Sequence, residues 1–142
     1  MKPIHRIDTH TFSEVDFQPV VEAFGWLVAL MNWSPRFDLS APRQVEAHLH
    51  TDEVFVLQRG KSVLFIANEQ GLDLIDMIPG VVYNVTCGTF HNVIGSSDAQ
   101  WLIVESSDDP AFPTEYRQLD SVECADLESR YPDWLKENES NK

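Results

Sequence analysis

Three histidines and one glutamate near the middle of the chain have the types and spacing of ligands for a metal ion. One residue separates His48 from His50, two residues separate His50 from Glu53, and His91 follows later in the chain. Side chains two positions apart on a strand point to the same face, so His48 and His50 project together if this segment is extended. Imidazoles joined by a carboxylate make a mixed nitrogen and oxygen metal site. These residues therefore predict a metal centre.

Two other residues are candidates for proton transfer at such a centre. Glu46 has the same parity as His48 and His50, so it could face the interior as a substitute ligand, as a partner of an imidazole or as a general base. It could equally face solvent if the strand pleat breaks before His48. Tyr83 carries a titratable hydroxyl near the predicted site and could move a proton or orient a substrate. Glu46 and Tyr83 are therefore the candidate catalytic residues.

The elements that would position these side chains are short β-strands. Between residues 43 and 106, apolar segments rich in Val, Ile, Leu and Phe alternate with turns, a pattern typical of a β-sandwich or barrel. Residues 54–57 and 63–66 are apolar at both parities, so both faces of these strands should be covered. The sequence predicts an all-β fold whose core barrel covers about residues 25–106.

The whole chain, residues 1–142, is predicted to form a single domain around this barrel. Residues 1–24 carry scattered hydrophobic side chains and are expected to form an arm that packs on the barrel. Residues 107–137 are expected to form a loop and a short helix. The helix should begin at Asp120, because Glu123 three residues later completes a capping box.

The acidic composition excludes several classes of partner. The 142 residues include 23 acidic and 10 basic side chains, which gives a formal net charge of −13. Phosphate backbones and anionic membrane surfaces repel such a chain, so neither nucleic acid nor a membrane is an expected partner. The sequence has no apolar block typical of a secretion signal or long enough to span a bilayer, which predicts a cytoplasmic protein.

The order of these residues resembles two motifs of the cupin superfamily. In the first motif two histidines and a glutamate precede a glycine, and in the second two glycines precede a histidine. The matching residues here are His48, His50, Glu53, Gly60, Gly80, Gly88 and His91. The turn between His50 and Glu53 is one residue shorter than the motif's turn, and Gly95 stands where the second motif ends in asparagine. The resemblance covers about the central half of the chain.

The resemblance implies an antiparallel β-barrel of the jelly-roll type with an N-terminal arm and a short C-terminal helix. It also implies one divalent metal ion inside the barrel, with His48, His50, Glu53 and His91 as ligands. Such a ligand set suits Fe, Mn, Zn, Ni or Cu about equally. Because a shortened turn changes where a carboxylate points, the sequence leaves open whether Glu46 or Glu53 faces the barrel interior.

Two classes of function fit such a barrel. The first is a metal-dependent enzyme acting on a small polar metabolite, such as an isomerase, a lyase or a dioxygenase, with the ion as Lewis acid and Glu46 or Tyr83 as proton shuttle. The alternative is a non-catalytic cupin that binds a small ligand or a metal, including one whose metal site has decayed. Small cupins often pair through an N-terminal strand, and the two-sided apolar strands need cover, so a homodimer is expected.

Overall fold

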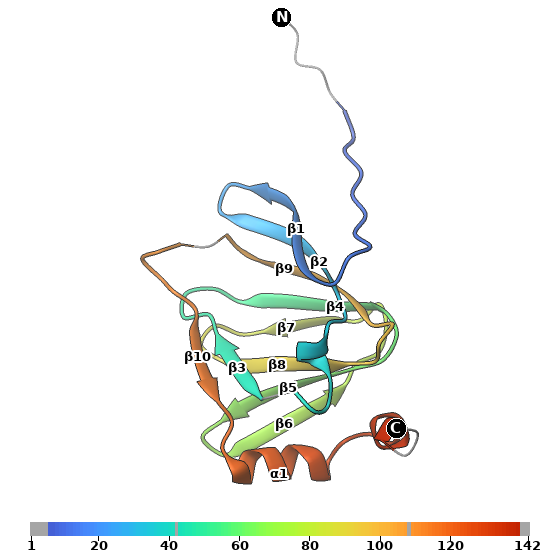
Figure 1. The fold of residues 1–142 in the computed structure, drawn as a ribbon. Coiled ribbons are helices and arrows are strands. Elements are labelled where there is room, and N and C mark those ends of the chain that lie inside the picture. The colour runs from blue at the N-terminus through green and yellow to red at the C-terminus, as the bar shows by residue number, and fades with distance from the viewer. Residues whose placement is uncertain (1–5, 42, 108, 140–142) are drawn as a thin grey trace, which may run out of the picture.

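Two antiparallel five-stranded sheets face each other and form the body of the molecule (Figure 1). The computed structural model describes residues 6–41, 43–107 and 109–139, so residues 1–5, 42, 108 and 140–142 of the predicted domain lie outside the described residues. The first sheet contains, in spatial order, β1 (Asp16–Ala23), β2 (Trp26–Asn32), β9 (Gln100–Ser106), β4 (Glu53–Arg59) and β7 (Val82–Val85). The second contains β10 (Glu115–Gln118), β3 (Gln44–Ala47), β8 (Phe90–Gly95), β5 (Ser62–Asn68) and β6 (Gly71–Asp76). The all-β prediction is confirmed.

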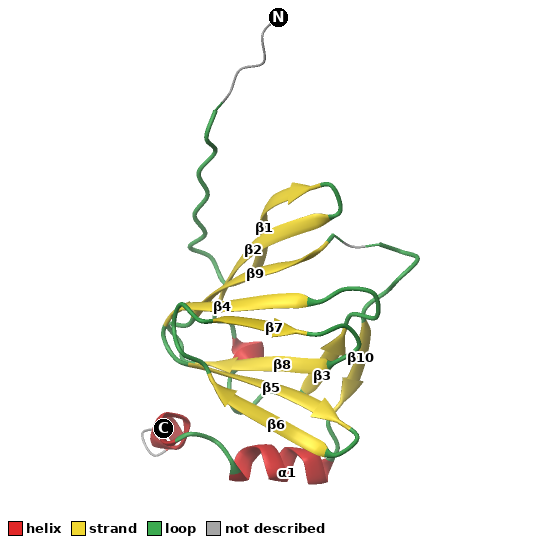
Figure 2. Ribbon diagram, turned by 180° about the vertical axis from the view of Figure 1, so that it is seen from behind, coloured by secondary structure: helices red, strands yellow, loops and turns green. Residues whose placement is uncertain are grey.

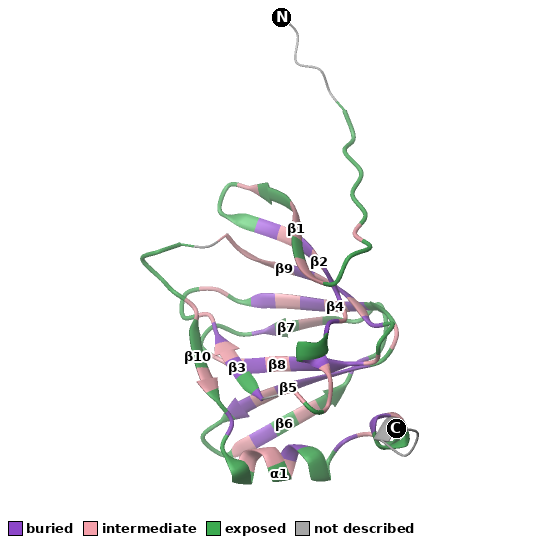
Figure 3. Cartoon of the chain, viewed as in Figure 1, coloured by how far each residue is buried: buried purple, intermediate pink, exposed green. Residues whose placement is uncertain are grey.

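Apolar side chains from both sheets meet in the interior, where the buried parts of the strands lie (Figure 3). Phe55 and Leu57 from β4 and Val93 from β8 belong to this core cluster. Glu53 has the same parity as Phe55 and Leu57, His91 has the same parity as Val93, and all five side chains are buried. Strand alternation therefore turns the Glu53 carboxylate and the His91 imidazole inward.

Trp101 on β9 fills one part of this core and leaves no room for a side chain at position 95. The indole is fully buried, its ring centroid lies 5.3 Å from that of Phe37 in the 3₁₀ helix η1 (Pro35–Phe37), and its Nε1 donates to Ser62 Oγ at 3.0 Å. A Cβ atom on Gly95 would lie 2.6 Å from a ring carbon of Trp101. The glycine that replaces the motif's asparagine is thus required by the packing of this barrel.

Two C-terminal helices, α1 (Ser121–Ser129) and α2 (Asp133–Glu139), lie against the outer side of the second sheet (Figure 2). Phe65 from β5 and Leu127 from α1 are fully buried in a second cluster there, which explains why residues 63–66 are apolar at both parities. Helix α1 begins as predicted: the Asp120 carboxylate accepts from the backbone N–H of Glu123, whose carboxylate accepts from Asp120 N–H. Neither helix of the described chain is long and apolar enough to cross a membrane.

The structure corrects the sequence at two ends of the barrel. Residues 16–23, expected in the arm, form β1 against β2, and an irregular register between Pro19 and Val21 interrupts the alternation that would have revealed the strand. Residues 115–118, expected in a loop, form β10 against β3, although this short segment is mostly polar. The described residues 6–15 precede β1 as an arm (Figure 1), and its end nearest β1 packs on the first sheet, because Asn32 Nδ2 donates to the carbonyl oxygens of Phe12 and Glu14 at 3.1 and 2.6 Å.

Candidate metal centre

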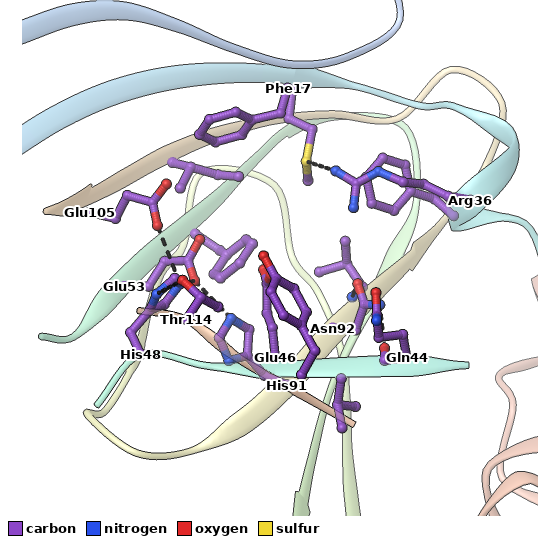
Figure 4. Close-up of a pocket in the computed structure, with 17 residues that line it drawn as sticks. Phe17, Arg36, Gln44, Glu46, His48, Glu53, His91, Asn92, Glu105 and Thr114 are labelled. Carbon is purple, nitrogen blue, oxygen red and sulfur yellow. Dashed lines mark hydrogen bonds and ion pairs between the residues drawn. The ribbon is translucent and has the colours of Figure 1, made fainter. Parts of the chain in front are cut away.

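Four side chains from three strands and one loop converge inside the barrel (Figure 4). They are Glu46 on β3, His48 just after β3, Glu53 at the start of β4, and His91 on β8. Each offers one ligand atom, and these atoms all lie within 4.8 Å of one another. Glu46 lies opposite His91 in the register of β3 and β8, so the sheet itself brings these two residues together. The group could hold a metal ion.

Glu53 is the centre of this cluster. Its Oε2 lies 3.0 Å from His48 Nε2 and 2.7 Å from His91 Nε2, and its side chain is 4% exposed. Burial by itself would raise the pKa of the Glu53 carboxyl, but the hydrogen bonds from His48 and His91 outweigh burial and lower it. Without a metal ion, the cluster is therefore a buried carboxylate shared by two imidazoles.

This arrangement favours the protonated form of both imidazoles. The hydrogen bond to Glu53 raises the pKa of His48 above its ordinary value, although burial opposes it. Burial disfavours the charged form of His91, but the hydrogen bond and the negative charge of Glu53 outweigh it, so the pKa of His91 is also raised. A metal ion would have to displace these protons before it could bind the two nitrogens.

The outer nitrogen of each imidazole is held by a neighbouring group. His91 Nδ1 lies 2.9 Å from the carbonyl oxygen of Thr89, which can only accept, so Nδ1 carries a proton and Nε2 is the nitrogen that can bind an ion. His48 Nδ1 lies 3.2 Å from Thr114 Oγ1 in the segment that leads into β10. Both Nε2 atoms consequently face the Glu53 carboxylate. Imidazole nitrogens that face inward through Nε2, together with carboxylate oxygens, fit a divalent metal ion.

Two further carboxylates border the cluster. Burial, reinforced by the negative charge of Glu53, raises the pKa of Glu46. Glu105 at the end of β9 lies 3.3 Å from His48 Nε2, although it is not among the residues predicted from the sequence. A signal was present, because Glu105 has the same parity as the buried Trp101 and Ile103, and a charged residue on an inward face indicates a function.

His50 does not join the cluster, although it was predicted to project with His48. Strand β3 ends at Ala47 and the chain bends at residues 49–50, so the two-residue alternation stops before His48. The exposed imidazole of His50 instead stacks on Phe112, with ring centroids 4.6 Å apart, and lies 3.4 Å from Ser106 Oγ. The pleat does break before His48, but Glu46 still faces inward because it lies within β3 opposite His91.

Tyr83 is also placed away from the cluster. It lies opposite Phe55 in the register of β7 and β4, two residues before Val85, which is the residue opposite Glu53. Its hydroxyl accepts a hydrogen bond from the backbone N–H of Ile78 at 2.9 Å. The Tyr83 hydroxyl is therefore engaged with the turn before β7.

The cluster forms one wall of a cavity of about 480 Å³ between the two sheets. The rest of the wall is mixed: Phe17, Phe55 and Ile103 supply apolar surface, and Arg36 supplies a positive charge. A cavity with apolar walls and a few convergent polar groups is the usual form of a small-molecule site. The geometry thus combines a group of metal-ligating atoms with space for a ligand beside it.

Comparison with known proteins identifies the fold through structure rather than sequence. No protein-family model and no curated protein sequence matches this chain. A cupin-2 domain-containing protein from Shewanella frigidimarina is 18% identical, with a TM-score of 0.51 over 68% of this chain and 85% of that chain. BH2720 from Bacillus halodurans is 15% identical (TM-score 0.53, 72% and 79% of the chains), and the WlaRB TDP-quinovose 3,4-ketoisomerase from Campylobacter jejuni is 17% identical (TM-score 0.50, 60% and 66%). At these identities the likeness shows the fold alone.

Proposed function

Because this chain has the cupin fold, we propose that it binds one divalent metal ion inside the barrel and acts as a metal-dependent enzyme on a small polar metabolite. The ligands in this proposal are His48, His91 and Glu53, and Glu46 lies beside them. One observation carries it: two imidazoles converge through Nε2 on one buried carboxylate in the wall of an open cavity. His50, which the sequence also suggested, is left out because it lies on the surface against Phe112.

The chemistry in this proposal is acid–base chemistry next to a Lewis acid. When bound, the ion would polarise a substrate oxygen. Glu46 lines the same cavity, and burial raises the pKa of its carboxyl, so its carboxyl oxygen holds a proton more readily than an exposed glutamate does, which suits a general acid or base. Isomerisation, elimination and dioxygenation remain the reaction classes of the proposal, and the shared fold of a sugar nucleotide ketoisomerase supports the first.

A second candidate function is a non-catalytic barrel that binds a small ligand without a metal. The observation that favours it is that Glu53, His48 and His91 satisfy one another's hydrogen bonds, and no buried side-chain polar atom of the described chain lacks a partner. A cluster whose buried polar groups already have hydrogen-bond partners can persist in a protein that no longer binds the metal. Metal content separates the two functions.

The first test is metal analysis of the untagged protein beside three histidine variants. We expect about one Mn, Fe or Zn ion per chain in the wild type, loss of the ion in His48→Ala and His91→Ala, and retention in His50→Ala, the matched control. Because bound protons must leave both imidazoles, the apparent metal affinity should rise as the pH increases above about 6.5. Wild-type protein that binds none of these ions by calorimetry would contradict the proposal and favour the second candidate.

We further propose that two copies of the chain pair through the outer face of the first sheet. Cross-strand rows of aliphatic side chains run across this face, half-buried except for Val82, which is exposed: Val28, Val104 and Val54 in one row, and Leu30, Leu102, Val56 and Val82 in the other. The second sheet has α1 and α2 over its outer face, whereas no described helix covers this one. The two aliphatic rows carry no charge themselves, although Arg59 lies beside them. On a chain of net charge −13 such a face suits a second copy, because pairing there brings few like charges together.

Sedimentation equilibrium tests this pairing. The wild type should be a dimer at micromolar concentration, and Val56→Glu should be monomeric because it buries a charge in the interface. Val122→Glu changes an exposed valine of α1 in the same way and should leave the dimer intact. A monomeric wild type would contradict the pairing.

A further inference from the structure

Arg36 gives the cavity a single strong positive charge. Among the described residues that line the cavity it is the one lysine or arginine, whereas Glu46, Glu53 and Glu105 supply three carboxylates. Figure 4 shows the Arg36 side chain across the cavity from His48 and Glu53, with its guanidinium end turned toward the space between them. A cation in this place has no role in holding a divalent metal, because like charges repel.

The guanidinium is fixed in position by groups from two segments. Asp16 at the start of β1 accepts hydrogen bonds from Arg36 Nε at 2.8 Å and from Nη2 at 2.6 Å, and the guanidinium lies 4.2 Å from the centroid of the Phe37 ring. Asp16 itself accepts from Ser34 Oγ and has a φ of +72°, a left-handed conformation that is uncommon for a residue with a side chain. The fold thus maintains an unusual backbone conformation at the residue that orients Arg36.

Charge balance indicates what Arg36 would bind. The ion pair with Asp16 already offsets part of its charge, and three more carboxylates line the cavity. A phosphate would place two negative charges beside Arg36 alone, next to the Asp16 carboxylate. A carboxylate brings a single charge and can accept from guanidinium N–H groups other than the Nε and Nη2 hydrogens that bind Asp16.

We propose that Arg36 binds a carboxylate of the substrate, whose other end reaches the metal centre, so that the substrates are small organic acids. This rests on the proposed metal-dependent function. Phe17, Met31 and Ile103 line the cavity as well, so the carbon chain between the two polar ends of the acid would contact apolar side chains. Arg36 is a binding residue in this proposal, and the Asp16 carboxylate is a positioning residue that acts through it.

The test is calorimetric titration of Mn²⁺-loaded protein with straight-chain dicarboxylates from malonate to adipate and with their monoamides, which keep the length but lack one charge. At least one diacid should bind the wild type, and more tightly than its monoamide. Arg36→Gln should lower the affinity for that diacid by about ten- to a hundredfold, as expected for loss of a charged hydrogen bond. Arg59→Gln removes an exposed arginine outside this cavity and should leave the diacid affinity unchanged.

Each protein is first titrated with Mn²⁺ alone, so that failure of the metal centre is distinguished from failure of the carboxylate site. Arg36→Lys replaces the same side chain but keeps a positive charge, so it separates loss of the charge from a disturbance of folding. This variant should bind the diacid more tightly than Arg36→Gln does. The inference is overturned if metal-loaded wild type binds no diacid at millimolar concentration, if the monoamide binds as tightly as the diacid, or if Arg36→Gln and wild type have the same diacid affinity. Wild type that binds no Mn²⁺ at all overturns the metal-dependent function and, with it, this inference.

Discussion

Replacing Glu53 with glutamine should lower the metal affinity at least a hundredfold and destabilise the metal-free protein by about 3 kcal/mol. The first effect follows because the carboxylate that faces both Nε2 atoms becomes a neutral amide. The second follows because Glu53 and His91 are almost fully buried and their contact is 2.7 Å long. An amide cannot offset the charge of the two imidazoles, whose pKa values Glu53 raises in the wild type. Calorimetric metal titration and urea unfolding measure the two effects separately.

The matched control is Glu22→Gln, which removes an exposed carboxylate from β1 and should change neither quantity. Glu46→Gln is the informative companion, since the sequence left open which of the two glutamates faces inward. If Glu46→Gln abolished metal binding while Glu53→Gln retained it, Glu46 would be the principal carboxylate ligand and the arrangement proposed here would be wrong.

Restoring the motif's asparagine by Gly95→Asn should destabilise the protein by about 3 kcal/mol or more, because the new side chain has no space. A Cβ at position 95 would lie 2.6 and 2.7 Å from two carbons of the Trp101 ring and 2.9 Å from the Ala99 Cβ. Trp101 cannot move aside without losing its contact with Phe37 and its hydrogen bond to Ser62. Urea unfolding, followed by circular dichroism, gives the change in the free energy of unfolding.

A double-mutant cycle shows whether the indole is the cause. Trp101→Phe removes the part of the indole that would contact the new Cβ. Gly95→Ala should therefore lower the free energy of unfolding by less in that background than in the wild type. If Gly95→Ala lowered the free energy of unfolding equally in the two backgrounds, contact with the indole would not be the reason for the glycine at this position. The metal affinity of each variant that folds should stay close to that of the wild type, because Gly95 lies at the far end of β8 from His91.

The sequence predicted the elements whose signals are local. Glu53 shares its parity with Phe55 and Leu57, and His91 with Val93, and the structure buries each of these sets. The capping box at Asp120 and Glu123 marked the start of α1. Strand β1 was missed because its register is irregular near Pro19, and β10 was missed because it is short and polar. These two strands are held by pairing with β2 and β3, which an isolated segment does not reveal.

For the site, the sequence by itself predicted three imidazoles and a carboxylate inside a cupin-like barrel, since residue types and motif spacing are properties of the chain. Only the tertiary structure decided which side chains meet. A bend at residues 49–50 sends His50 to Phe112, while the pairing of β3 with β8 sets Glu46 opposite His91. Arg36 reaches the same cavity from η1, oriented by Asp16 twenty residues earlier in the chain. Alternation gives the direction of a side chain only while a strand continues, and contacts between distant segments depend on how the sheets pair and close.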